Sequence, residues 1–165
     1  MLRTITEPRH NKSVSAYVAV AVLLMLCTSV RAQTLTECGK SDGYAYFFPG
    51  GIIPADKSGW QKDGISGRII LNYINDELDL LIKDAMGSTV SAKQKGGEIF
   101  LIQASGGFIA LSVVYKNEGK VITTESYAFQ IDRRGDGMVA WVAIRTASAM
   151  ANKMSLMTAQ CRGPK

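Results

Sequence analysis

From Gly67 onward, hydrophobic and polar residues alternate in short segments, each closed by turn-forming residues after about ten positions. In the segment 108–115, for example, Ile109, Leu111 and Val113 fall on one face of an extended chain, and the residues between them fall on the other. A period of two is typical of β-strands. The pattern predicts these strands: Gly67–Ile74, Glu77–Ala85, Thr89–Gln94, Glu98–Ala104, Phe108–Tyr115, Lys120–Ile131, Met138–Thr146 and Lys153–Cys161.

The residues between these segments favour tight hairpin turns. Asn75-Asp76 and the glycine pairs at 96–97 and 106–107 readily adopt the positive φ angles that such turns need. Strands joined in this way form an antiparallel meander. We therefore predict a single all-β domain of about 8 or 9 strands that closes, fully or partly, into a barrel, because closure removes exposed sheet edges. A two-sheet sandwich is the alternative.

The segment 147–152 fits a strand less well. Ala147, Met150 and Ala151 match the spacing of a helical stripe. We expect one short helical turn there, before the last strand.

The segment Pro49–Ser66 also breaks the regular spacing, and it directly follows the aromatic run Tyr44–Phe48. Long connections are uncommon in compact domains unless they bind something, and the large apolar residues of this one argue against disorder. We predict that this loop binds a protein partner or a small ligand, with Trp60 as the anchor; the alternative is that Trp60 folds inward and caps the core. The candidate contact residues are three apolar residues with charged neighbours: Ile52, Ile53, Asp56, Lys57, Trp60, Lys62 and Asp63.

The first 32 residues have the pattern of a secretory signal peptide. Basic residues precede an apolar run at 16–27, and the small residues Val30 and Ala32 fit the positions before a cleavage site. The apolar run is shorter than the roughly 20 residues that span a bilayer, although an uncleaved anchor is the alternative. We expect cleavage after Ala32, export to the periplasm or the cell exterior, and one mature domain, 33–165, without a membrane span.

Cleavage would leave two cysteines, Cys38 and Cys161, near opposite ends of the mature chain. In an oxidising compartment, two cysteines most simply form one disulfide. We predict this bond, with Cα atoms about 4.4 to 6.8 Å apart. It would tie the start of the fold to its end.

Charge and histidine content exclude several functions. The net charge of +5 is concentrated in the leader, and the mature domain keeps 15 basic and 13 acidic residues, so we expect no nucleic-acid binding. The one histidine, His10, also lies in the leader. Histidine-dependent triads and zinc sites are therefore excluded from the mature chain, and we expect no cofactor or metal.

Weaker signals leave other functions open. Glu77, Asp79 and Glu125 could support carboxylate catalysis, but the first two fit solvent-facing acids at a strand start. Arg134-Gly135-Asp136 matches an integrin-binding tripeptide, although its composition also suits a turn. Methionines with spacing similar to that of copper-binding proteins equally suit a hydrophobic core; these are Met150, Met154 and Met157.

Three functions thus remain: a non-catalytic binding domain that uses the loop 49–66, a structural envelope protein, and an enzyme that works without histidine. The absence of histidine favours the first two.

Overall fold

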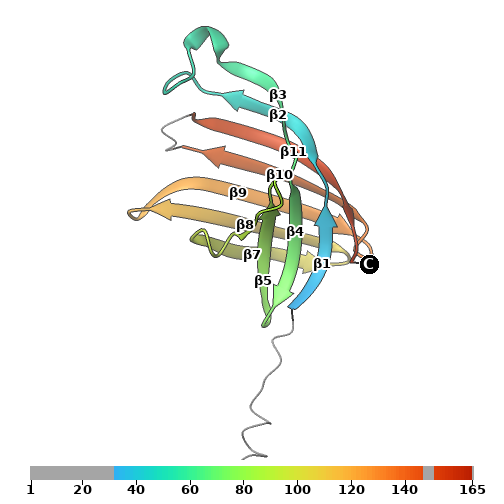
Figure 1. Cartoon of the computed structure of the whole chain (residues 1–165). Helices are drawn as coiled ribbons and strands as arrows, with labels where there is room; N and C mark the ends of the chain where they lie inside the picture. The colour runs from blue at the N-terminus through green and yellow to red at the C-terminus, as the bar shows by residue number, and fades with distance from the viewer. Residues whose placement is uncertain (1–31, 147–150, 165) are drawn as a thin grey trace, which may run out of the picture. The chain divides into compact units, whose positions relative to one another are not determined.

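The computed structural model describes residues 32–146 and 151–164, which form one antiparallel sheet and a single turn of 3-10 helix (Figure 1). The predicted all-β fold is confirmed. Residues 1–31 of the predicted signal peptide and residues 147–150 of the predicted helical turn lie outside the described residues. The elements are β1 (Ala32–Cys38), β2 (Ser41–Phe47), η1 (Ala55–Lys57), β3 (Gly59–Ile65), β4 (Arg68–Ile74), β5 (Glu77–Lys83), β6 (Thr89–Ser91), β7 (Gly97–Ser105), β8 (Phe108–Asn117), β9 (Lys120–Ile131), β10 (Gly137–Arg145) and β11 (Lys153–Arg162).

The eight predicted strands correspond to β4 through β11, and no end differs from its predicted position by more than three residues. Their hairpins use the expected turn chemistry: Asn75 and Asp76, between β4 and β5, have φ angles of 50° and 64°. Local alternation and turn residues are therefore sufficient to define this part of the chain.

The predicted loop 49–66 is shorter than expected, because Gly59–Ile65 forms β3 and pairs with β2 along its whole length. The glycines of the segment 49–66 suit a loop in sequence, but Gly64 has a different role. A Cβ at this position would lie 2.7 Å from the backbone oxygen of Ser41, so glycine permits the close approach of the two strands.

The sheet order is β6-β5-β4-β1-β11-β10-β9-β8-β7, and β2 and β3 branch off beside β11. The strands β1 and β2 are separated only by residues 39–40, and β3 and β4 only by 66–67. Together they form one long bent hairpin whose β2–β3 half stays beside β11. Gly67 allows the bend, since a Cβ there would lie 2.2 Å from the oxygen of Lys83.

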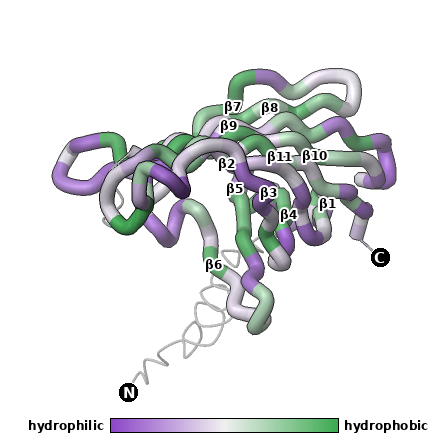
Figure 2. The backbone as a smooth tube through the Cα atoms, turned by 90° about the horizontal axis from the view of Figure 1, so that it is seen from above, coloured by the Kyte–Doolittle hydropathy of each residue, from purple (hydrophilic) through white to green (hydrophobic). Residues whose placement is uncertain are grey.

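The sheet does not close into a barrel: β6 and β7 remain its two ends. Because β6 has only three residues, it cannot provide a long edge for pairing with β7. Instead, β1, β4 and β5 cross one face of the β7–β11 meander, as Figures 1 and 2 show. The domain is therefore a partly closed, sandwich-like sheet.

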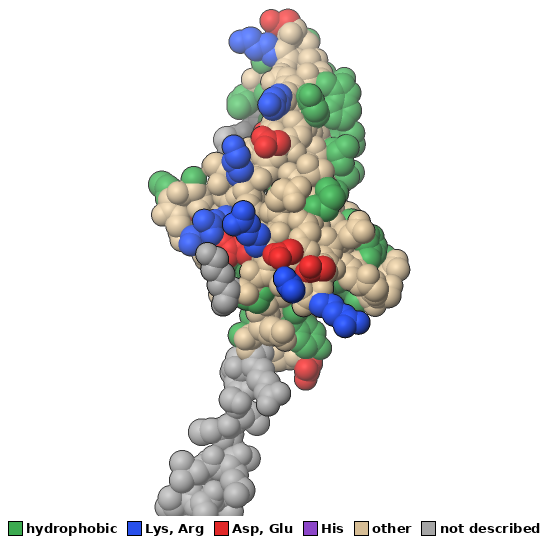
Figure 3. Space-filling model, turned by 90° about the vertical axis from the view of Figure 1, so that its right-hand side faces the viewer, with side chains coloured by type: hydrophobic (Ala, Val, Ile, Leu, Met, Phe, Trp, Pro, Cys, Tyr) green, Lys and Arg blue, Asp and Glu red, His purple; other side chains and the backbone are tan. Residues whose placement is uncertain are grey.

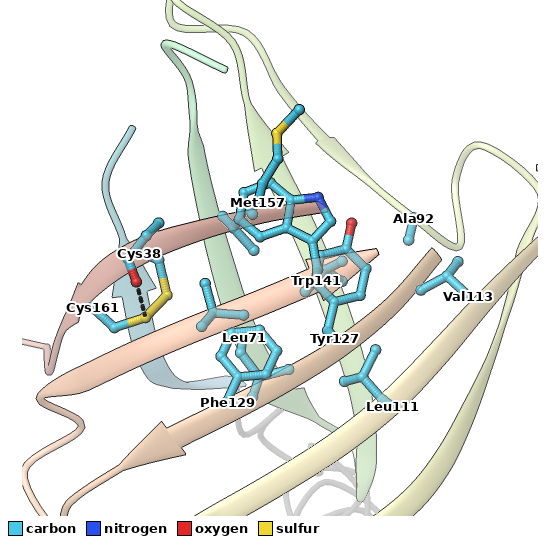
Figure 4. Close-up of a cluster of buried hydrophobic side chains, with 14 of the residues drawn as sticks. Cys38, Leu71, Ala92, Leu111, Val113, Tyr127, Phe129, Trp141, Met157 and Cys161 are labelled. Atoms are coloured by element: carbon cyan, nitrogen blue, oxygen red, sulfur yellow. Dashed lines mark hydrogen bonds between the residues drawn. A yellow bond between two sulfur atoms is a disulfide. The ribbon is translucent and has the colours of Figure 1, made fainter. Parts of the chain in front are cut away.

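The hydrophobic core lies between these two layers (Figure 4). Leu71 and Leu80 from one layer pack against the face of the meander that carries Phe129 and Trp141. The Tyr127 ring stacks between these two aromatic rings, with centroid distances of 6.2 Å and 5.9 Å. We call this buried face of the meander, continued across β2 and β3, the inner face, and the opposite one the outer face.

The disulfide between Cys38 and Cys161 is present, and both residues are buried. It links β1 to β11, so the predicted contact between the first and last strands is confirmed. The Cα atoms are 3.8 Å apart, below the expected range, and the two cysteines lie directly opposite each other on paired strands. The bond holds the corner where the bent hairpin leaves β11.

Candidate functional site

Large apolar side chains cluster on the outer face of β2, β3 and β11. Pairing between the strands places Tyr46 beside Trp60 and Tyr44 beside Leu156. The exposed fractions are 59% for Tyr44, 59% for Trp60 and 55% for Leu156. With Phe48, which directly follows β2, these residues form what we call the aromatic surface.

Ring contacts stabilise the arrangement of this surface. The Tyr46 centroid lies 5.0 Å from that of Phe48 and 5.5 Å from that of Trp60, and both pairs meet edge to face. Such contacts are favourable for aromatic rings. Because the rings also project from paired strands, they are held in place before any partner binds, which lowers the entropic cost of binding.

The apolar character of the outer face continues beyond these rings. Met154 lies beside Tyr46 and is followed on β10 by Ile144, which is 41% exposed. Figure 3 shows hydrophobic side chains gathered along one edge of the molecule, while many charged side chains lie on the surface facing the viewer. Soluble monomers rarely expose a contiguous apolar area of this kind without a function.

The predicted contact residues do not all belong to this surface. Trp60 and Lys62 lie on the outer face, beside Tyr46 and Tyr44. Asp63 points to the inner face, where its carboxylate accepts a hydrogen bond from the Lys153 ammonium at 2.7 Å.

The other four predicted residues lie between β2 and β3. Ile52 is 67% exposed, whereas Ile53 is half-buried and exchanges backbone hydrogen bonds with Gly50. Asp56 and Lys57 belong to η1 and are exposed. The structure therefore brings Trp60 and Lys62 together with two tyrosines and with Leu156, a residue that sequence reasoning did not select. Its position on the exposed parity of β11 was the available signal.

The inner face carries a buried carboxylate, Glu125, which accepts a hydrogen bond from the Tyr127 hydroxyl at 2.7 Å. Burial, followed by the charge of Glu125, raises the pKa of Tyr127 well above its usual value. Burial and Glu125 also raise the pKa of Tyr115. Both hydroxyls therefore stay protonated at neutral pH, and Tyr127 acts as a hydrogen-bond donor within the core.

The two carboxylates at the start of β5 have different environments. Glu77 is exposed and forms an ion pair with Lys93, whose hydrogen bond lowers the pKa of Glu77. Asp79 is buried and accepts a hydrogen bond from the Ser91 hydroxyl at 2.7 Å. The expectation that Asp79 faces water is wrong, because β6 and the turn after it pack beside β5.

Among the described residues, the buried hydroxyl of Ser155 has no hydrogen-bond partner, so no base lies within hydrogen-bond distance of it. Across 32–146 and 151–164, no group of three or more His, Cys, Asp or Glu side chains is arranged to hold a metal ion.

The Arg134-Gly135-Asp136 tripeptide forms a turn that packs against the domain. Gly135 is buried, and its backbone oxygen accepts a hydrogen bond from the Thr36 hydroxyl at 2.6 Å. The Asp136 carboxylate accepts one from the Gly163 amide at 3.0 Å. The tripeptide is thus held by hydrogen bonds to β1 and to the residue that follows β11, rather than presented on a protruding tip.

The methionines do not share one environment. Met154 lies on the outer face and Met157 is buried in the core, while Met150 falls outside the described residues. Two thioethers on opposite faces of β11 cannot bind the same ion.

A broad, open depression of about 810 Å³ lies away from the aromatic surface. Its lining includes Asp132, Asp136, Met138 and Cys161, and none of the residues of the aromatic surface.

No protein-family model, curated protein or solved structure matches this chain. In the part of the chain that the structure describes, no helix is long and apolar enough to cross a membrane. Function is therefore inferred from the geometry of the domain.

Proposed function

We propose that this chain is an exported, non-catalytic β domain that binds a protein partner through the aromatic surface. The observation that carries this proposal is the exposure of Tyr44 and Trp60, both at 59%, beside Leu156 on a regular sheet. Tryptophan and tyrosine are enriched among the residues that contribute most to protein–protein binding, because they bury large areas with few rotatable bonds.

The surroundings of the aromatic surface also suit a protein interface. Such interfaces combine an apolar centre with a polar rim. Lys62 of β3 lies beside Tyr44 of β2. The exposed Asp42 lies on the same face of β2, two residues before Tyr44. Both charged side chains are therefore placed to form part of a rim.

An open sheet face favours a macromolecule over a small ligand. Small-molecule sites are concave and enclose most of their ligand. The depression of about 810 Å³ is elsewhere on the domain, and the aromatic side chains project from an open face. A protein with a complementary apolar patch would cover these side chains more completely than a small molecule.

Export is supported by the disulfide between Cys38 and Cys161, which suits an oxidising compartment, and by the signal-peptide pattern of residues 1–32. Cleavage after Ala32 would leave Gln33 to Cys38 of β1 in place.

The proposal is tested by photo-crosslinking in cells that make the protein. A benzophenone amino acid replaces Trp60 or Tyr44 in the full chain, and the matched control replaces Tyr73, a tyrosine of β4 that is 39% exposed. We expect the same discrete protein adduct from positions 60 and 44, and none from position 73. An adduct of equal yield at all three positions, or none at 60 and 44, contradicts the proposal.

A further inference from the structure

The second candidate for an interaction is a sheet edge. In the described residues, β7 is one end of the sheet and pairs only with β8. Its start is tied to the turn after β6, since the Gly97 amide donates to the Ala92 oxygen at 2.8 Å. From residue 98 onward, no described strand pairs with the edge of β7 that faces away from β8 (Figures 1 and 2).

Three consecutive large apolar residues are exposed in the middle of this edge strand. The exposed fractions are 50% for Phe100, 55% for Leu101 and 65% for Ile102. The pairing with β8 shifts between Leu101 and Gln103, so Ile102 is an extra residue without a partner on β8. Edge strands of this composition form hydrogen bonds readily with another extended chain.

The other free edges of the sheet are protected. The strand β6 has three residues and is followed by Lys93 and Lys95, and β3 carries adjacent charges at Lys62 and Asp63. Short length and charge are two devices that prevent unwanted strand pairing. A bulge is a third, and β7 has one at Ile102.

By contrast, β7 has nine residues, no proline and one charged residue, Glu98, at its start. Both carboxylate oxygens of Glu98 accept hydrogen bonds from Lys116 at 2.8 Å, so even this charge is compensated. Residues 99–105 of β7 carry no charge. The edge strand β3, by contrast, carries charged residues, and the edge strand β6 is only three residues long.

We propose that β7 pairs antiparallel with β7 of a second copy of this chain, which joins the two sheets edge to edge. Pairing centred on Leu101 places Phe100 opposite Ile102 of the second copy, so apolar residues meet apolar residues. Glu98 then lies opposite Ala104 of the second copy, and no like charges face each other. A strongly charged partner strand would find no complementary charge on 99–105.

Sedimentation velocity of the mature, disulfide-bonded protein over about 1 to 100 µM tests this interface. We expect a concentration-dependent dimer. Ile102→Lys should weaken the dimer at least about tenfold, because it places a charge against an apolar partner strand. The matched control is Trp60→Lys, which changes a similarly exposed residue on the aromatic surface and should leave the dimer unchanged. Far-ultraviolet circular dichroism, which reports the backbone, checks that both variants keep the fold.

A second measurement is independent of whether Ile102→Lys folds. Leu101→Cys should form a covalent dimer on mild oxidation, since the two copies of residue 101 lie opposite each other, whereas Trp60→Cys should not. A wild-type protein that stays monomeric up to about 100 µM overturns the proposal, as does a dimer that Trp60→Lys disrupts and Ile102→Lys does not. This interface and the partner proposed for the aromatic surface can fail separately, because they use different residues.

Discussion

Replacing Cys38 and Cys161 together with alanine is expected to lower the free energy of unfolding by up to about 5 kcal/mol. The bond joins residues 123 positions apart, so its loss releases a very large loop in the unfolded chain. A single domain of this size is stabilised by about 5 to 15 kcal/mol in total. The variant should therefore retain only part of its stability, or unfold at physiological temperature.

Urea unfolding of wild type and double variant, followed by circular dichroism, measures this difference. Wild type treated with a reductant is the matched control and should lose a similar amount of stability. A loss below about 1 kcal/mol would show that the corner between β1 and β11 holds without the bond.

Phe129→Ala is expected to cost about 3 to 5 kcal/mol of unfolding free energy. The Phe129 side chain is fully buried in the core and is packed beside the Tyr127 ring. Its removal leaves a cavity between the two layers, because their backbones cannot collapse to fill the space.

Phe100→Ala is the matched control, because Phe100 is 50% exposed at the sheet edge. Measured at low protein concentration, where the proposed β7 dimer is dissociated, this change should cost less than about 1 kcal/mol. Equal losses for the two variants would contradict the assignment of the inner face as the core.

The predictable part of the fold is the part set by local chemistry. From β4 to β11, alternation and turn residues such as Asn75 and Gly106 mark each strand and each reversal of the chain. The partner of Cys38 could also be predicted, since Cys161 is the one other cysteine outside the predicted leader.

The first three strands could not be located in the same way. In β2 and β3, residues such as Gly43 and Gly64 resemble loop residues in sequence. Gly43 is required because a Cβ there would lie 2.1 Å from the backbone oxygen of Leu156 on the neighbouring strand. Only the long-range pairing reveals this requirement.

The candidate site was predicted in part for the same reason. Trp60 was selected because it is a large apolar residue in a segment interpreted as a loop, and the structure exposes it. Its neighbours on the outer face come from β2 and β11, and Leu156 is 96 positions away in the sequence. Successive side chains of a strand point to opposite faces, so Asp63 lies on the opposite face of β3 from Trp60. An interpretation of this segment as a loop cannot anticipate this.

The most direct test of the binding proposal is the affinity of Trp60→Ala for the partner identified by crosslinking, measured together with its unfolding free energy. We expect affinity to fall by about 2 kcal/mol or more, which is roughly thirtyfold, while the unfolding free energy changes by less than about 1 kcal/mol. Trp141, the other tryptophan, is buried and reports unfolding by fluorescence in both proteins. An unchanged affinity, or a loss of about 3 to 5 kcal/mol in unfolding free energy, would contradict the account and make Trp60 a residue of the fold rather than a binding anchor.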